Sequence, residues 1–156
     1  MVGVYWLGSK GQTGARAHAS VVDEPPMAKG AGRTVRILLA DDERPARSFL
    51  TRVLECEGWA VDAVPDGEAA VASWPSDGSP YDVVVLDVNM PSKGGYEAYC
   101  DLHELHPQAN FVFMSGYADE ALWSKIGDVG APRLIKPFAP KQLIEAVHRL
   151  LGAERT

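Results

Sequence analysis

Cysteine and long apolar segments are scarce in this sequence. Its 156 residues include two cysteines, Cys56 and Cys100, which form neither a disulfide framework nor a CxxC metal motif. We expect both to be small residues packed on helices. No apolar segment approaches the length of about 20 residues that a membrane-spanning helix needs. The apolar residues 2–8 lack the basic region and cleavage site of a signal peptide, so we expect a cytoplasmic protein.

Basic residues are also scarce, and acidic residues outnumber them. The chain has 15 Lys and Arg residues against 21 Asp and Glu residues, which gives a net charge of −6. A nucleic-acid-binding surface needs clustered Lys and Arg to neutralise phosphates, and the sequence shows no such cluster. We therefore expect protein partners, with neither a nucleic acid nor a membrane among them.

The sequence divides into two parts. Residues 1–33 are rich in Gly, Ala and Ser, and they show neither the period of a helix nor that of a strand. We predict a disordered N-terminal tail there, and Met27, near its end, is an alternative start of the chain. Residues 34–153 are long enough for one domain with a full hydrophobic core. The sequence ends about where the last predicted helix ends, so we expect no attached output domain.

From residue 35 onward, segments typical of strands alternate with segments typical of helices. We predict strands at residues 35–40, 59–64, 81–87, 110–115 and 133–136, and helices at residues 41–58, 67–74, 96–106, 119–127 and 140–152. Four apolar side chains share one face of the first helix: Phe49, Leu50, Val53 and Leu54. Five strands, each followed by a helix, predict an α/β fold with a doubly wound, parallel, five-stranded sheet and right-handed crossovers.

Polar residues end or follow four of the five predicted strands. They are Asp41 and Asp42 after the first strand, Asp87 at the end of the third, Ser115 at the end of the fourth and Lys136 at the end of the fifth. The carboxyl ends of parallel strands meet at one edge of the sheet, where open α/β sheets bind ligands. We therefore predict that these five side chains share one pocket.

The chemistry of the five side chains is complementary. Three carboxylates a few ångströms apart repel one another by roughly 1 kcal/mol per pair in water and by about 4 kcal/mol at an effective dielectric constant of 20, so a cation must compensate them. Such oxygen ligands suit Mg²⁺, which takes one or two carboxylates and keeps several waters. Lys136 adds a positive charge, and Ser115 adds a hydroxyl donor. Together these groups can bind the oxygens of a phosphoryl group on a carboxylate.

Four segments in order carry a family resemblance over about residues 35–152. They are ILLADDE with the acidic pair, VVVLDVNMP with Asp87, MSGYA with Ser115 and LIKPF with Lys136. The chain resembles the receiver domain of two-component response regulators, in particular the stand-alone, chemotaxis-regulator-like members. The resemblance implies the flavodoxin-like strand order 2-1-3-4-5. It also implies a signalling protein that catalyses only its own phosphorylation and dephosphorylation.

The resemblance further implies roles for individual residues. Asp87 would accept a phosphoryl group from a phosphohistidine on a sensor histidine kinase or a phosphotransfer protein. Mg²⁺ would be held by Asp42, Asp87 and the backbone carbonyl of Asn89, with Asp41 acting mainly through water. Lys136 would pair with the acyl phosphate.

The resemblance also implies features of the last third of the chain. The peptide bond between Lys136 and Pro137 is expected to be cis. The fourth helix, the fifth strand and the fifth helix are expected to contact a downstream protein, and we predict that Trp123 on the fourth helix is partly exposed. Arg133 stands where the family often has a Tyr or Phe that turns inward on phosphorylation, so we expect no aromatic switch of the usual kind. Gly94 stands where many members have Asp, so we expect a looser turn there.

Three other interpretations remain open. Asp41 and Asp42 can cap the first helix, since Asp is favoured at helix N-termini. A Mg²⁺-dependent phosphohydrolase of the haloacid-dehalogenase type also uses a strand-end Asp, but it has a second Asp two residues later, where this chain has Asn89. A receiver that docks partners without being phosphorylated is the third interpretation, although all of the acidic residues are present here.

Overall fold

The computed structural model describes residues 32–78, 80–116 and 120–153, so the predicted tail lies almost entirely outside the described residues and stays a prediction. Five strands alternate with five helices: β1 (Arg36–Ala40), α1 (Arg44–Cys56), β2 (Ala60–Val64), α2 (Gly67–Ala72), β3 (Val83–Asp87), α3 (Gly95–Leu105), β4 (Asn110–Ser115), α4 (Glu120–Gly127), β5 (Arg133–Ile135) and α5 (Pro140–Ala153). Each predicted element is present, with ends that differ from the predicted ones by a few residues. None of these helices combines the length and the apolar composition needed to cross a membrane.

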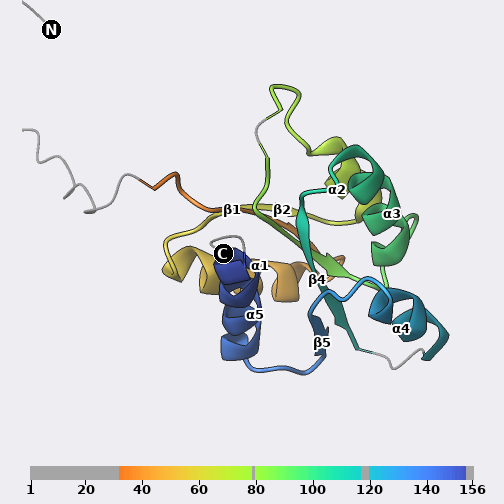
Figure 1. Cartoon of the computed structure of the whole chain (residues 1–156). Helices are drawn as coiled ribbons and strands as arrows, with labels where there is room; N and C mark the ends of the chain where they lie inside the picture. The colour runs from red at the N-terminus through yellow and green to blue at the C-terminus, as the bar shows by residue number, and fades with distance from the viewer. Residues whose placement is uncertain (1–31, 79, 117–119, 154–156) are drawn as a thin grey trace, which may run out of the picture. The chain divides into compact units, whose positions relative to one another are not determined.

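The five strands form one parallel sheet in the order β2-β1-β3-β4-β5. Helices α1 and α5 lie on one side of this sheet, and α2, α3 and α4 lie on the other side (Figure 1). The predicted doubly wound fold and its strand order are therefore confirmed. Because every strand is parallel, all five carboxyl ends lie at the same edge of the sheet.

Two apolar clusters fill the space between the sheet and its helices, and β3 belongs to both. Val83 and Val85 pack in the cluster with α1 and α5, whereas Val84 and Leu86 pack in the cluster with α2, α3 and α4. All five residues of β3 are buried, as expected for a central parallel strand that is covered on both faces. The strand therefore has a polar residue only where it ends, at Asp87.

The predicted apolar face of α1 is only partly correct. Leu50 and Leu54 are buried and Val53 is partly buried, whereas Phe49 is 55% exposed. An α-helix turns about 100° per residue, so Phe49 points about 140° away from Leu54. The buried stripe follows the two leucines, and the prediction is wrong for Phe49.

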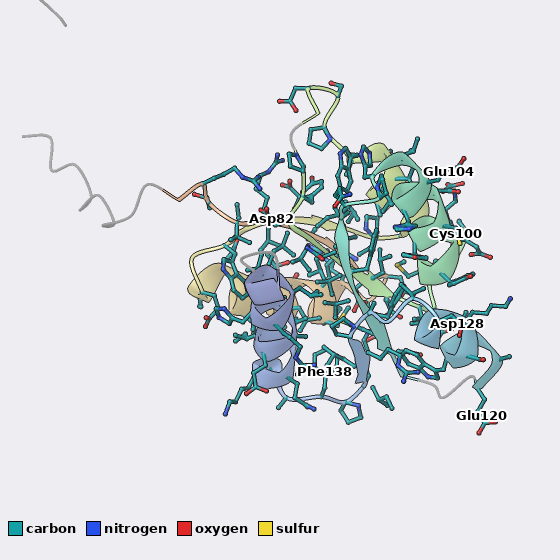
Figure 2. The ribbon with its side chains drawn as sticks, viewed as in Figure 1. Asp82, Cys100, Glu104, Glu120, Asp128 and Phe138 are labelled. Carbon is teal, nitrogen blue, oxygen red and sulfur yellow. The ribbon has the colours of Figure 1, made fainter. Side chains whose placement is uncertain are left out.

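The prediction that both cysteines pack against neighbouring elements is also wrong. Cys56 and Cys100 are free thiols on exposed residues, and Figure 2 shows Cys100 on the outer side of α3. Each cysteine follows a buried residue, Leu54 or Ala98, by two positions. Two positions correspond to about 200° around a helix, so both thiols point to solvent.

Candidate functional site

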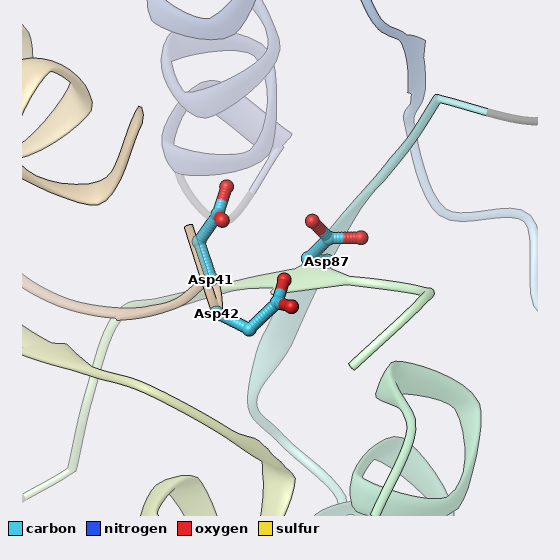
Figure 3. Close-up of side chains that lie close together, drawn as sticks. All are labelled: Asp41, Asp42 and Asp87. Atoms are coloured by element: carbon cyan, nitrogen blue, oxygen red, sulfur yellow. The ribbon is translucent and has the colours of Figure 1, made fainter. Parts of the chain in front are cut away.

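Three carboxylates meet at the carboxyl ends of the neighbouring strands β1 and β3. Asp41 and Asp42 directly follow β1, and Asp87 is the last residue of β3. Each of the three offers one carboxylate oxygen, and these oxygens lie within 4.8 Å of one another (Figure 3). The sequence-based prediction that Asp41, Asp42 and Asp87 share a pocket is therefore correct.

The three carboxylates differ in burial and in partners. Asp41 is fully buried, Asp87 is 5% exposed and Asp42 is exposed. The Asp41 carboxylate accepts the backbone N–H of Glu43 at 2.9 Å and the Lys136 ammonium at 2.8 Å. Neither aspartate is the N-cap of α1, because the N-cap residue is Glu43, whose own side chain makes no capping hydrogen bond. The capping interpretation is therefore wrong, and the two aspartates belong to the pocket.

Lys136 brings the positive charge of the pocket from the edge strand. Its backbone N–H donates to the Ser115 carbonyl at 2.8 Å, which continues the pairing of β5 with β4. Its Nζ atom donates to Asp87 at 2.7 Å and to Asp41 at 2.8 Å. The peptide bond from Lys136 to Pro137 is cis, as predicted. One ammonium group therefore bridges the first and the third strand.

Burial and this bridge shift two pKa values. Burial raises the pKa of the Asp87 carboxyl above its ordinary value, although the Lys136 ammonium and the Asn89 N–H both favour its charged form. Burial works to lower the pKa of Lys136, but its hydrogen bonds to Asp41 and Asp87 outweigh burial and raise it. Asp87 is thus a poorly hydrated carboxylate whose charge is compensated mainly by a lysine that stays protonated.

Asn89 connects Asp87 to Ser115. The backbone N–H of Asn89 donates to the Asp87 carboxylate at 3.0 Å, and its side-chain Nδ2 donates to the Ser115 hydroxyl at 3.1 Å. Ser115 ends β4 and is only 1% exposed. The sequence led us to expect a role for the backbone carbonyl of Asn89 only, and its side-chain contact was missed.

The loop after β3 needs a residue without a side chain beside the site. The N–H of Gly95 donates to the Val88 carbonyl at 3.1 Å, and a Cβ atom on Gly95 would lie 2.2 Å from the Asp87 carbonyl oxygen. Any larger residue at this position would push the loop away from Asp87. Gly94, where we expected a looser turn, donates its N–H to the Glu97 side chain at 2.7 Å, so this turn is held by α3.

Arg133 and Trp123 form a contact beside the site, on β5 and α4. The Arg133 guanidinium lies 5.5 Å from the centre of the Trp123 ring, and Nη1 donates to the Trp123 carbonyl at 3.3 Å. Trp123 is partly buried, as predicted, whereas Arg133 is exposed and the neighbouring Ile135 is 60% exposed. The residue in the position of the usual aromatic switch is therefore an arginine that packs on an aromatic ring.

The match to a protein-family model agrees with this geometry. The model of the response regulator receiver domain matches residues 37–148, which include every element from β1 to most of α5. All of the strand-end residues of the site lie within the matched region.

Curated relatives are similar to the chain over the same region. The receiver protein CpdR of Brucella abortus is 32% identical over 122 residues, which cover 76% of this chain and 98% of CpdR. The transcriptional regulatory protein TcrA of Mycobacterium tuberculosis is 47% identical over 129 residues, 81% of this chain and 49% of TcrA. The sensor kinase CckA of Brucella abortus is 34% identical over 116 residues, 74% of this chain but 12% of CckA. The chain thus spans nearly all of CpdR, about half of TcrA and a small part of CckA.

Solved structures of similar proteins have the same fold. A response regulator receiver protein from Sinorhizobium medicae superimposes with a TM-score of 0.70 at 34% identity, over 77% of this chain and 96% of that chain. The response regulator TrrA of Thermotoga maritima, solved in complex with Mg²⁺ and BeF, superimposes with a TM-score of 0.66 at 29% identity, over 75% and 99%. The chain belongs to the response regulator receiver domains, the phosphoacceptor signalling modules of two-component systems, which catalyse no reaction beyond their own phosphorylation chemistry.

Proposed function

We propose that Asp87 is the residue that accepts the phosphoryl group. The observation that carries this proposal is the position of its carboxylate, at the end of β3, 2.7 Å from the Lys136 ammonium and beside Asp41 and Asp42. The phosphoryl group would leave the nitrogen of a phosphohistidine as the P–N bond breaks, and a new P–O bond would form to an Asp87 oxygen. The new bond would use a lone pair of the carboxylate, and the electron pair of the broken P–N bond would stay on the histidine nitrogen, which would then leave as the leaving group.

We propose that the acidic residues hold Mg²⁺ during this transfer. The donor set fits the ion, because three hard carboxylate oxygens lie within 4.8 Å and Asp42 is open to solvent. Asp42, Asp87 and the backbone carbonyl of Asn89 would be direct ligands. Asp41, whose carboxylate already binds Lys136 and the Glu43 N–H, would act through water. The bound cation would neutralise charge on the phosphoryl oxygens.

Two further side chains would bind the phosphoryl oxygens. Lys136 would exchange its contact with the Asp87 carboxylate for one with the acyl phosphate, because both are anions at the same position. Ser115 would donate its hydroxyl proton to another phosphoryl oxygen, and its hydroxyl is already held beside Asp87 through Asn89.

The phosphoryl donor would be a sensor histidine kinase or a phosphotransfer protein. The receiver domain would consist of residues 34–153, after a tail of residues 1–33, and the protein would work in the cytoplasm. Receiver domains take part in signalling with histidine kinases, and part of a sensor kinase is among the relatives. With such a donor, the protein would either pass the phosphoryl group on in a phosphorelay or act as a regulator by protein contact.

The downstream partner would bind the face made by α4, β5 and α5. This face presents Trp123, Arg133 and the 60% exposed Ile135 close together. Aromatic and arginine side chains are enriched among residues that dominate binding energy at protein interfaces. The face therefore offers a recognition surface with an arginine, Arg133, at the position where the family often has a Tyr or Phe.

The experiment that tests this function is phosphorylation of the purified protein by radiolabelled acetyl phosphate with Mg²⁺. The Asp87→Asn variant keeps the shape of the side chain and removes the nucleophile, so we expect it to incorporate no acid- and base-labile phosphate. Asp128→Asn is a matched control at an exposed residue directly after α4, and it should label like the wild type. Labelling of Asp87→Asn at the wild-type level would overturn the assignment.

A further inference from the structure

Arg47 reaches back from α1 to the loop that carries the acidic pair. Its Nη1 atom donates to the backbone carbonyl of Asp41 at 2.6 Å and to that of Asp42 at 3.4 Å. The backbone of Arg47 is fixed in the first turn of the helix, where its N–H donates to the Glu43 carbonyl at 2.8 Å. The guanidinium group therefore ties two consecutive peptide groups to the start of α1.

This connection matters because the side chain of the N-cap residue, Glu43, makes no capping hydrogen bond at the start of α1. The buried carboxylate of Asp41 is held by its own hydrogen bonds to Glu43 and Lys136. Asp42 is exposed, so the orientation of its carboxylate depends on the backbone that carries it. Arg47 contacts that backbone directly, at the carbonyl groups of the two peptide groups that flank the Asp42 Cα atom.

We propose that Arg47 is a positioning residue for the metal site: by holding the carbonyls of Asp41 and Asp42, it keeps the Asp42 carboxylate in the orientation that binds Mg²⁺. This inference rests on the proposed Mg²⁺ site. A guanidinium group repels a divalent cation, so electrostatics and positioning predict opposite effects when Arg47 is removed. Loss of charge alone strengthens Mg²⁺ binding, whereas loss of positioning weakens it.

The test is a Mg²⁺ titration of the unphosphorylated full chain, followed by tryptophan fluorescence or NMR shifts. Arg47→Met keeps the length of the side chain and removes both the charge and the donors. We expect its Mg²⁺ affinity to fall about threefold to tenfold, which corresponds to about 0.7 to 1.4 kcal/mol. Arg47→Lys keeps the charge, but its side chain is one bond shorter and its ammonium group cannot take the exact position of Nη1, so its affinity should fall between those of Arg47→Met and the wild type.

Arg44→Met is the matched control, because Arg44 is an exposed arginine in the same first turn of α1. It removes the same charge, and its Mg²⁺ affinity should stay the same or rise slightly. Mg²⁺ affinity of Arg47→Met equal to or above that of the wild type would overturn the inference. If Arg47→Met does not fold, the affinity of the Arg47→Lys variant decides, and a value equal to that of the wild type would also overturn it.

Asp42→Ala in the same titration separates this inference from the proposed metal site. If the wild type binds Mg²⁺ and Asp42→Ala weakens binding while Arg47→Met does not, only the role of Arg47 is wrong. If the wild type and Asp42→Ala have the same affinity, the proposed ligand set itself is wrong, and the role of Arg47 falls with it.

Discussion

Toward the amino end of the sheet, Asp82 before β3 and Asp62 on β2 each have an arginine partner. At the carboxyl end, three carboxylates lie close together and two of them share the Lys136 ammonium. Asp82 pairs with Arg33 and also accepts the backbone N–H of Arg36 at 2.7 Å, beside the start of the described chain (Figure 2).

This difference separates a structural arrangement from a functional one. At the amino end the charges of Asp62 and Asp82 are balanced by arginines of the chain itself, so these groups stabilise the fold without any ligand. At the carboxyl end the chain leaves an excess of negative charge at Asp41, Asp42 and Asp87, which a cation can compensate. The comparison predicts that mutations at the carboxyl end depend on Mg²⁺ and that mutations at the amino end do not.

The largest effect on stability is expected for Lys136→Met. This change leaves the buried Asp41 and Asp87 carboxylates without their ammonium partner, and breaking a fully buried pair costs about 3 to 5 kcal/mol. The Lys136 side chain is 23% exposed, so we expect a loss of about 2 kcal/mol without Mg²⁺ and a smaller loss with it. Urea denaturation with and without Mg²⁺ measures this difference. Lys141→Met, which removes an exposed lysine of α5, is the control, and equal Mg²⁺ dependence in both variants would contradict the account.

A smaller effect of opposite sign is expected for Asp42→Ala. Removing one of three neighbouring carboxylates relieves repulsion, which is about 1 kcal/mol per pair for groups surrounded by water, and Asp42 is exposed, so the variant should be slightly more stable than the wild type without Mg²⁺. The gain should disappear when Mg²⁺ is added, because the wild type then gains stability from binding. Thermal denaturation at several Mg²⁺ concentrations follows this crossover. If the variant is less stable than the wild type in the absence of Mg²⁺, repulsion among the three carboxylates does not limit the stability of the fold.

For Tyr81→Phe, at the amino end of the sheet, we expect the smallest change in stability at neutral pH. Burial and the hydrogen bond to Asp62, at 2.7 Å, raise the pKa of Tyr81 from 10.0 to about 12. Because the pKa is higher in the folded state, the contribution of Tyr81 is complete below about pH 10 and is lost as the pH rises toward 12. The stability of the wild type should therefore fall more steeply over this range than that of Tyr81→Phe. An equal slope in both proteins would show that Asp62 does not hold the phenol protonated.

The strands and the strand-end residues were predictable because each depends on a short-range pattern. A buried parallel strand must be apolar on both faces, so the sequence of β3 is an apolar segment that ends at Asp87. The parallel topology then places Lys136 at the same edge of the sheet as Asp87. The exposure of Phe49 was not predictable from the apolar positions alone, because the buried stripe of α1 is set by the packing of Leu50 and Leu54.

The side-chain contacts of the site were harder to predict. The bond from Arg47 to two backbone carbonyls depends on the path of the chain between β1 and α1, which the sequence pattern does not define. The only signal in the sequence was the position of Arg47, one turn into the helix that follows the acidic pair. The bond from Asn89 to Ser115 likewise depends on the path of the loop after β3, and the sequence led us to expect a role only for the backbone carbonyl of Asn89.

The most direct test of the central assignment is to identify the phosphorylated residue chemically. The wild-type protein is phosphorylated with acetyl phosphate and Mg²⁺ and then reduced with borohydride, which converts an aspartyl phosphate into homoserine, and the peptides are sequenced by mass spectrometry. We expect homoserine at position 87 in the peptide that contains β3, and none at Asp41 or Asp42, since these residues would hold the metal. Homoserine at either of those positions with an intact Asp87, or phosphate retained after reduction, would show that Asp87 is not the phosphoacceptor.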